Sequence, residues 1–490
     1  MPVTLHCNQL FQNRQELYQF LFNCQQVACE KQTVQIVSIT TGIQSIDPLA
    51  IFHELAHPDQ LNFYFEKQTL AHHAHSMRAQ WAIAAIDSVA AAPIQSDGPS
   101  GHPMGDRFEQ AKHFIHTTLN NTILTGDLRQ PFAGPHFFCS FTFAPQLVPQ
   151  HPNPFPVVTV FLPRWQISRH PEGCTVVANL AIRPTTAIAP LVEQTWAMFQ
   201  RLQSQPFALL RLPPLPRPWL NRTDHDHDHH FQTAVQAALA SIRQQTFHKI
   251  VLSHALDVVA PAPFDCTHSL HNLRQLYPDC YIFSVSNGQG VSFIGASPER
   301  LVSLQQRQLL TDALAGSAPR GGSPAADAQL ANRLLNSAKE MHEHQVVLDF
   351  IVGQLRQLGM QPDALPLRLL TLPNIQHLHT PIRATLPAHL HLLDVVATLH
   401  PTPAVAGMPR AIACEQIQHY EPWARSLYAA PIGWVNYEGD GEFAVGIRSA
   451  FVQGCQARLL AGAGIVAGSD PQRELAEVKL KLQALLAALV

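Results

Sequence analysis

Residues 281–314 read YIFSVSNGQGVSFIGASPERLVSLQQRQLLTDAL, and this stretch decides the fold. Two alternating apolar runs flank Asn287-Gly288, a pair that favours the tight turn of a β-hairpin. Residues 299–314 have the pattern of a second hairpin, and residues 443–466 that of a third. Successive hairpins build antiparallel sheet. With helices covering the faces of that sheet, the pattern predicts a layered α+β architecture.

The chain before this stretch is predicted to form an N-terminal half of mixed helices and strands, residues 1–215. Aromatic and β-branched runs predict strands, and amphipathic runs predict helices. The strand-like runs are residues 33–42, 61–68, 136–145 and 155–169, and the helix-like runs are residues 106–121 and 189–205. Residues 233–490 alternate long strands and helices without an internal repeat and form a second predicted region.

Residues 216–232 between the two halves are predicted to be a Pro- and His-rich linker or loop. Four histidines, at positions 225, 227, 229 and 230, alternate with aspartates in a pattern that can chelate a transition metal. Metal ligation needs a rigid frame and supporting hydrogen bonds, and such a run promises neither. A solvated tract is therefore the favoured interpretation.

Composition limits the functional classes. The 490 residues carry a net charge of −3, which argues against a nucleic-acid or anionic membrane partner. No run approaches the length of a membrane-spanning helix, and the N-terminus does not resemble a signal peptide. The nine cysteines include no CxxC pair, so reduced thiols and a cytosolic (cytoplasmic) location are expected.

Two charged helices attract attention in the C-terminal half. In residues 336–355, Ser337 and Glu340 form the pattern of a capping box, and helical spacing puts Glu343 on an apolar face. An acid on such a face needs a cation or a metal ion. The structural alternative is an exposed pair between Lys339 and Glu343, four residues apart.

The C-terminal segment 461–490 begins with the small-residue strand end Ala461-Gly462-Ala463-Gly464, which lets a ligand approach backbone N–H groups. Ser469 or Asp470 then caps a helix with Pro471 in its first turn. Three charged residues share one face of that helix, and a solvated charged face is the alternative. They are Glu474, Glu477 and Lys481.

Two cations lie in predicted strands. Arg448 has apolar neighbours, so it is expected to face an anion or to form an internal salt bridge. Lys249 stands at the start of the predicted strand 247–258, with no acid near it in sequence. It is either an edge charge or a base directed into a cavity.

Seven motifs in order resemble the chorismate-utilising enzymes, and among them the isochorismate synthases. The resemblance covers residues 233–485, and more loosely 61–68 and 136–169. It implies that residues 233–490 are the chorismate-binding catalytic region. The motifs are HKIVLSHA (248–255), FIGASPERLVSL (293–304), LTDALAGSAPRG (310–321), SAKEMHEHQVVLDFI (337–351), LHPTPAVAGMPR (399–410), YAAPIGWVNYEGDGEFAVGIRSAFV (428–452) and LLAGAGIVAGSDPQRELAEVKLK (459–481).

The resemblance implies an antiparallel β-sandwich with helices outside, related to anthranilate synthase component I, and a Mg²⁺ ion with chorismate as substrate. Glu343 and Glu477 would hold the metal, with Glu474 as a further ligand through water, since Mg²⁺ prefers oxygen ligands. The ring carboxylate of chorismate would face the ion. The other implied substrate contacts are Arg448, Tyr428, Lys481, and the backbone amides of Gly462, Ala463 and Gly464.

In the isochorismate synthases the lysine matching Lys249 is the general base that activates water, and the acid matching Glu299 protonates the departing C4 hydroxyl. A free lysine has a pKa near ~10.4. Burial and a nearby cation would lower it toward ~7–8, whereas burial would raise the pKa of Glu299. The two roles therefore require opposite environments on either side of one ring.

Further positions favour the hydrating branch. Ala315 stands where aminodeoxychorismate synthases carry a nucleophilic lysine, and aminating relatives carry glutamine at the position of Lys249. His400, in LHPTPAVAG, is expected to line the active site or to be a core histidine. Ser426 and Ala430 replace two family glycines, which puts close ligand approach there in question.

The resemblance implies no glutaminase subunit, and a monomer is expected. Quinone synthesis of the menaquinone or phylloquinone type is the preferred pathway. The alternatives are a siderophore pathway, a salicylate synthase that also eliminates pyruvate, an aminating synthase, and a metal-buffering protein that uses the histidine run.

Overall fold

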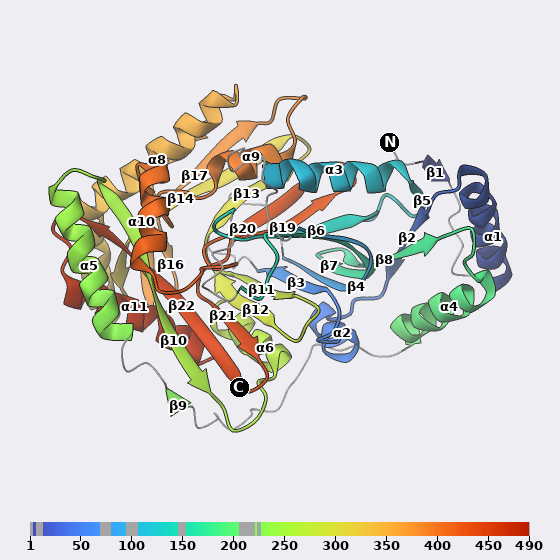
Figure 1. Ribbon diagram of the computed structural model, residues 1–490, viewed down its shortest axis with the longest axis horizontal. Coiled ribbons are helices and arrows are strands. Elements are labelled where there is room, and N and C mark those ends of the chain that lie inside the picture. Colours follow the sequence, from blue (N-terminus) through green and yellow to red (C-terminus); the bar gives the residue numbers. More distant parts are fainter. Residues whose placement is uncertain are drawn as a thin grey trace.

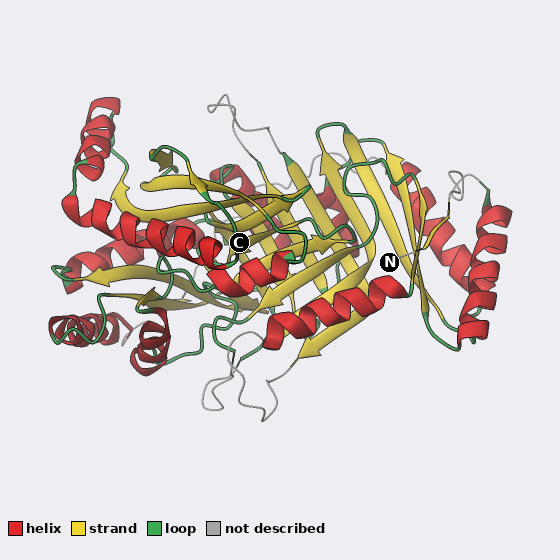
Figure 2. Ribbon diagram, turned by 90° about the horizontal axis from the view of Figure 1, so that it is seen from above, coloured by secondary structure: helices red, strands yellow, loops and turns green. Residues whose placement is uncertain are grey.

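A computed structural model describes the backbone of residues 3–5, 13–68, 80–94, 106–145, 153–204, 221–222 and 227–489. The chain forms a mixed helix and sheet fold in which strands lie in stacked layers and helices cover them (Figures 1 and 2). The predicted α+β class and the antiparallel sandwich with outer helices are confirmed. No helix in these ranges is long and apolar enough to cross a membrane.

The strands are given in chain order. They are β1 (Val3–Leu5), β2 (Gln35–Ile43), β3 (Asn62–Lys67), β4 (Trp81–Ile94), β5 (Thr122–Gly126), β6 (His136–Phe141), β7 (Val158–His170), β8 (Gly173–Ile182), β9 (Asn221–Arg222), β10 (Lys249–Val259), β11 (Tyr281–Ser286), β12 (Ser292–Ser297), β13 (Arg300–Gln305), β14 (Gln308–Pro319), β15 (Asp363–Ala364), β16 (Arg368–Thr371), β17 (Ile375–Thr385), β18 (Gly407–Met408), β19 (Pro431–Asn436), β20 (Gly441–Val445), β21 (Ser449–Gln453) and β22 (Gln456–Val466).

The helices cluster at the ends and outer faces of the sheet layers. Helices α5, α8, α10 and α11 lie at the end of the molecule that holds β10 and β22, and α1 and α4 pack together at the other end (Figure 1). They are α1 (Arg14–Lys31), α2 (Pro48–Leu55), α3 (Asp106–Asn120), α4 (Ile188–Ser204), α5 (His227–Arg243), α6 (Cys266–Leu276), α7 (Pro324–Leu335), α8 (Ala338–Gln357), α9 (Leu392–Leu399), α10 (Arg410–Tyr420) and α11 (Pro471–Leu486).

Antiparallel pairing joins most neighbouring strands. The three predicted hairpins are present as β11–β12, β13–β14 and β21–β22. Only the pairs that β5 makes with β1 and with β2 are parallel among the described strands. The deciding stretch therefore builds consecutive antiparallel strands, as its turn residues predict.

The N-terminal and C-terminal halves share one sheet. Strand β3 pairs with both β4 and β11, and β6 pairs with both β7 and β19. Aromatic side chains from the two halves fill the space between these strands: the rings of Phe65 and Tyr281 stack with centroids 5.4 Å apart. The division at residues 215 and 233 stays a prediction, but the two halves are not separate sheets.

Two local predictions need correction. Helix α5 begins at His227, so residues 227–232 are helical where a loop was predicted. Ser337 caps α8 by accepting a hydrogen bond from the backbone N–H of Glu340. The Glu340 carboxylate does not return that bond, because it accepts one from the backbone N–H of Ser317 instead. The predicted capping box was therefore wrong in one of its two hydrogen bonds, the one from the Ser337 backbone N–H to the Glu340 side chain.

Candidate active site

A single pocket gathers most of the predicted site residues. It lies where β10, β14, β17 and β22 meet helices α8 and α11, and it holds about 890 Å³ including its open mouth. Its walls are formed by Val251, Pro298, Glu299, Leu314, Ala315, Gly316, Ser317, Lys339, Glu340, Glu343, His377, Ala404, Val405, Tyr428, Ala429, Ile447, Arg448, Ala461, Gly462, Gly464, Glu474, Glu477 and Lys481.

One wall of the pocket is acidic, and lysines neutralise it. The Lys249 ammonium lies 2.8 Å from the Glu343 carboxylate, and only 3% of the Lys249 side chain is exposed. The chain passes close by at Gly464, where an added Cβ would lie 2.6 Å from Glu343 Oε1. Glycine at this position therefore makes room for the carboxylate.

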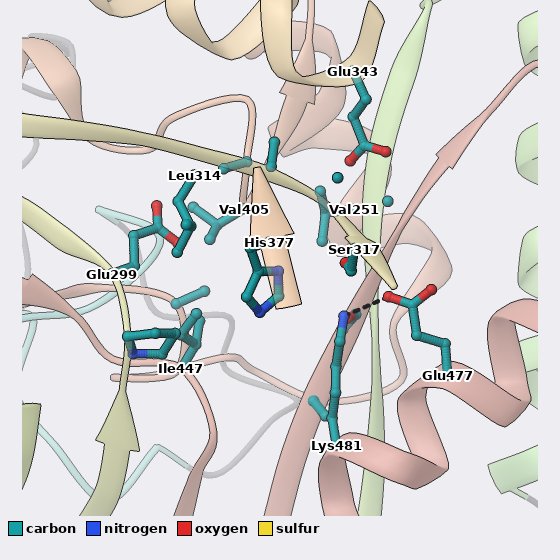
Figure 3. A pocket seen from close by; sticks show the side chains of 18 of the residues that line it. Val251, Glu299, Leu314, Ser317, Glu343, His377, Val405, Ile447, Glu477 and Lys481 are labelled. Carbon is teal, nitrogen blue, oxygen red and sulfur yellow. Dashed lines mark hydrogen bonds and ion pairs between the residues drawn. The ribbon is translucent and has the colours of Figure 1, made fainter. Parts of the chain in front are cut away.

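Helix α11 presents the other acids of this wall. Asp470 caps the helix, and Pro471 occupies its first turn, as predicted. Lys481 Nζ lies 2.8 Å from Glu477 and also donates to the carbonyl of Gly462. Figure 3 shows the Glu477–Lys481 pair below the inward-pointing Glu343. The shared face of α11 thus faces the pocket and not bulk solvent.

Lys339 bridges the two helices. Its ammonium lies 3.5 Å from Glu474 and 3.8 Å from Glu340. The alternative exposed pair with Glu343 is not formed, since Glu343 contacts Lys249. Burial, together with the charges of neighbouring acids, raises the pKa of both Glu340 and Glu474. Burial opposes ionisation of Glu477 too, but the charge of Lys481 outweighs it and lowers that pKa.

These acids fit a hard divalent cation in their chemistry. Four carboxylates line one wall, and their mutual repulsion contributes to the raised pKa values of Glu340 and Glu474. Oxygen donors of this kind are the ligands that Mg²⁺ takes in proteins. Among the described residues no three His, Cys, Asp or Glu side chains already stand in ligand positions. Binding therefore requires rotation of these side chains away from their lysines.

Glu299 lies on the opposite side of the pocket. His377 stands between Glu299 and the acidic wall (Figure 3). Glu299 is only 4% exposed, and no described residue donates a hydrogen bond to its carboxyl group. Burial raises its pKa to about 8, against a lowering by Lys249 and a further raising by Asp312. The carboxyl is thus held in its protonated form at neutral pH, as the sequence predicts for an acid.

Arg448 is a buried cation in the pocket wall. It is buried, and none of the described acids forms an ion pair with it. Its guanidinium donates to Nε2 of His377 over 2.8 Å, and burial lowers its pKa. Its backbone has φ of 50°, a left-handed conformation that is uncommon outside glycine. A buried cation without an acid is prepared to bind the carboxylate of a ligand.

The sequence compares with known proteins along nearly its full length. Residues 19–490 match the family model described as "Chorismate binding enzyme". The chain belongs to the chorismate-binding enzyme family. It is 40% identical to the salicylate biosynthesis isochorismate synthase of Pseudomonas aeruginosa over 262 residues, 53% of this chain and 54% of that one. It is 32% identical to isochorismate synthase EntC of Escherichia coli K12, over 64% of this chain and 80% of that one.

Solved structures of the family share the fold. The structure of the putative 2,3-dihydroxybenzoate-specific isochorismate synthase DhbC of Bacillus anthracis superposes with a TM-score of 0.67 and 26% identity. The match covers 90% of this chain and 99% of the DhbC chain. The structure of MenF, the menaquinone-specific isochorismate synthase of Escherichia coli, superposes with a TM-score of 0.71 and 24% identity. The match covers 92% of this chain and 94% of the MenF chain. The alignments with the first curated relatives span about half of their length, 54% in each case.

Most residues predicted for the site of this family do meet. Ala315, Tyr428, Gly462 and Gly464 line the pocket with the acids and Arg448. A Cβ on Gly462 would lie 2.9 Å from the Tyr428 hydroxyl, so this glycine lets the ring approach the strand. Burial raises the pKa of Tyr428, which keeps it protonated.

Three predicted residues are absent from the wall. Lys249 lies behind it and contacts the wall residue Glu343 over 2.8 Å. His400 does not line the pocket: it is 1% exposed, and its ring packs edge-on against Phe143 with centroids 5.8 Å apart. The alternative of a core histidine is therefore the correct one. Ala463 is fully buried and is absent from the wall, although its neighbours Gly462 and Gly464 belong to it.

Sequence reasoning missed His377, Ser317 and the inward role of Lys339. His377 and His379 stand two apart on β17, where strand periodicity puts both on one face. That face was not identifiable without the pairing of β14 with β17, which sets His377 opposite Ser317. Buried histidines at strand spacing were the available signal.

The histidine run has structural contacts where it is described. A ring nitrogen of His227 contacts the carbonyl of Ala255 at 3.0 Å, and one of His230 contacts the carbonyl of Tyr420 at 2.8 Å. Position 225 lies outside the described residues. These contacts attach the start of α5 to its neighbours and favour the solvated-tract interpretation over a metal site.

Proposed function

We propose that this protein is an isochorismate synthase, an isomerase that converts chorismate to isochorismate. The observation that carries the proposal is the opposition of Lys249 and Glu299. A buried amine paired with Glu343 lies on the acidic side, and a buried carboxyl with a pKa of about 8 lies on the other. Relatives named as isochorismate synthases support the same activity.

The reaction balances with these two groups. Lys249 in its neutral form takes a proton from water, and the water oxygen bonds to ring carbon 2. The ring double bonds shift, the C4–O bond breaks, and Glu299 gives its proton to the departing hydroxyl, which leaves as water. Lys249 is then charged and Glu299 ionised, so one proton must return from the amine to the carboxyl by way of solvent. General acid–base catalysis of this kind contributes roughly 10²–10⁴-fold in rate.

Arg448 and the acidic wall would hold the substrate at its two carboxylates. Arg448, with Tyr428 and the amides near Gly462, faces the enolpyruvyl carboxylate, as a buried guanidinium without an acid partner should. Lys481 contributes positive charge beside Gly462. This arrangement keeps the ring between Lys249 and Glu299.

A Mg²⁺ cofactor is part of the proposal. Glu343 and Glu477, with Glu474 directly or through water, would hold the ion, which would supply positive charge for binding the ring carboxylate. Glu343 must leave Lys249 to do so.

Hydration is favoured over amination by two positions. Lys249 stands where the aminating branch carries glutamine, and Ala315 stands in the pocket wall where the aminodeoxychorismate branch carries its nucleophilic lysine. A glutaminase subunit is not required by the proposal. We further propose a role in quinone synthesis, supported by the 36% identity to isochorismate synthase MenF of Bacillus subtilis over 260 residues.

The test is product identification. Purified protein is incubated with chorismate and Mg²⁺, and the product is separated by chromatography and identified by proton NMR. Isochorismate alone supports the proposal. Salicylate fluorescence would assign a salicylate synthase, an ammonia-dependent amino product would assign the aminating branch, and unreacted chorismate would refute the activity. Complementation of a menaquinone-deficient strain tests the pathway.

A further inference from the structure

Behind Glu299 the sheet buries a charged group that the proposed reaction does not use. Asp312 on β14 is its centre, and 11% of the Asp312 side chain is exposed. Nε2 of His379, on β17, lies 2.9 Å from its carboxylate. The Arg300 guanidinium, on β13, lies 3.8 Å from it on the other side. An acid held from two neighbouring strands is a fixed charge.

Arg300 is itself held in place. Its Nε donates to the Tyr281 hydroxyl over 2.9 Å, and that hydroxyl donates to Glu442. Glu442 also lies 3.7 Å from the guanidinium. Burial would raise the pKa of Asp312, but the charge of Arg300 and the hydrogen bond with His379 outweigh it and hold that pKa well below its usual range. Asp312 therefore stays ionised at every pH at which the enzyme would work.

Strand geometry directs Asp312 toward the acid. Asp312 and Leu314 are two residues apart on β14, so their side chains lie on the same face. Leu314 lines the pocket beside Glu299 (Figure 3). The backbone of Glu299 is fixed as well, since its carbonyl accepts a hydrogen bond from the Val445 N–H over 3.1 Å. The strands that carry Asp312 and Glu299 are thus held in place by their neighbours.

We propose that Asp312 is a positioning residue whose buried negative charge keeps the Glu299 carboxyl protonated between turnovers. The inference rests on the proposed function, because it explains how the acid regains its proton. A second negative charge beside a fixed one in a low-dielectric site is costly, so the proton returns to Glu299.

The other groups that face Glu299 do not favour its protonated form through a negative charge. Lys249, from β10, favours the ionised form of Glu299. Tyr428 is neutral because burial raises its pKa. His377, on β17, is neutral because burial and the adjacent Arg448 lower its pKa, and the Arg448 cation would favour ionisation. Asp312 is thus the described group whose charge, added to the effect of burial, opposes ionisation of Glu299.

The test measures the proton on Glu299 directly. The infrared carbonyl band of a protonated carboxyl group is followed against pH in the wild-type protein and in Asp312→Asn, with the Glu299→Gln spectrum subtracted from each. We expect the midpoint to fall by about one pH unit in Asp312→Asn, a tenfold loss of proton affinity. The alkaline limb of the activity profile should move down by the same amount.

Two variants separate charge from packing. Asp312→Glu keeps the charge, so its midpoint should stay near that of the wild type even if its rate falls. Glu442→Gln removes another acid that contacts Arg300, and it should shift the midpoint less than Asp312→Asn. If Asp312→Asn does not fold, as judged by circular dichroism, Asp312→Ser takes its place.

The results that would overturn this inference differ from those that would overturn the proposed isochorismate synthase activity. A lower rate with an unchanged midpoint in Asp312→Asn would make Asp312 a structural residue and overturn the inference. Equal shifts in Asp312→Asn and Asp312→Glu would also overturn it. Because the infrared midpoint needs no substrate, it can support the inference even where the product assay rejects isochorismate synthesis.

Discussion

The two sides of the pocket hold the same functional group in opposite states. On the acidic side Glu343 lies 2.8 Å from an ammonium group, and Glu477 has its own lysine at the same distance. On the other side Glu299 is buried without a donor, and its pKa rises to about 8. A carboxyl group with a cation partner is a ligand or a counter-ion, whereas one without a partner is a proton donor. Environment, and not residue type, assigns the roles.

The largest expected effect comes from removing the base. Lys249→Ala should lower isochorismate formation by about 10²–10⁴-fold, because no other group replaces it at that side of the ring. Chorismate binding, measured by calorimetry, should persist. Lys479→Ala is the matched control, since Lys479 lies on α11 with 45% exposure and pairs with Asp228 outside the pocket. A wild-type rate for Lys249→Ala would remove this residue from the reaction.

Metal removal tests the acidic side next. EDTA should abolish turnover, and added Mg²⁺ should restore it. Glu343→Gln should raise the Mg²⁺ concentration for half-maximal binding by at least about tenfold, because a ligand oxygen loses its charge. Calorimetric titration of the protein with Mg²⁺ alone gives this value without an activity assay. Activity that survives exhaustive chelation would show that these carboxylates form ion pairs with lysines and do not bind a metal ion needed for the reaction.

The Glu299 side is tested by pH. Activity needs the protonated carboxyl, so it should fall as pH rises through about 8. Each further unit costs about tenfold. The stability of the fold should also decrease as pH rises. Between pH 4.5 and about 8 the folded state keeps a proton on Glu299 that the unfolded chain has lost, so the free energy of unfolding falls over this range.

Glu299→Gln serves as the control for that pH effect. The amide cannot ionise, so the variant should be inactive but should lose less stability than the wild type over the same pH range. Thermal unfolding at a series of pH values measures the difference. Parallel curves for the two proteins would mean that Glu299 is not protonated in the folded state.

The smallest change adds one methyl group on the acidic side. In Gly464→Ala the new Cβ would lie 2.6 Å from Glu343 Oε1 and 3.3 Å from Lys249 Cε. The carboxylate must move away from the amine, and we expect a several-fold loss of rate with a modest loss of stability. Gly353→Ala, in α8 with open space around it, should instead gain about 0.5–1 kcal/mol of stability. Equal changes in rate and stability in the two variants would show that the Glu343 carboxylate does not lie close to Gly464.

The sequence predicted the elements better than the partners. The Asn287-Gly288 turn and strand periodicity were sufficient for the hairpins, and helix spacing put Glu477 and Lys481 on one face. The Lys249–Glu343 pair was not predictable from residues alone, since 94 positions separate its members. His400 was misplaced for a similar reason, because its position depends on packing against Phe143 from the other half of the chain.

The sharing of one sheet by both halves has a consequence for how the protein is made. Lys67, at the end of β3, donates to the carbonyl of Asp279, 212 residues later. During synthesis the hydrogen-bonding edge of β3 therefore stays open until β11 leaves the ribosome, and an open edge of apolar strand readily pairs with other chains. We expect truncated chains that end before β11 to aggregate, and the nascent protein to depend on chaperones that cover strand edges.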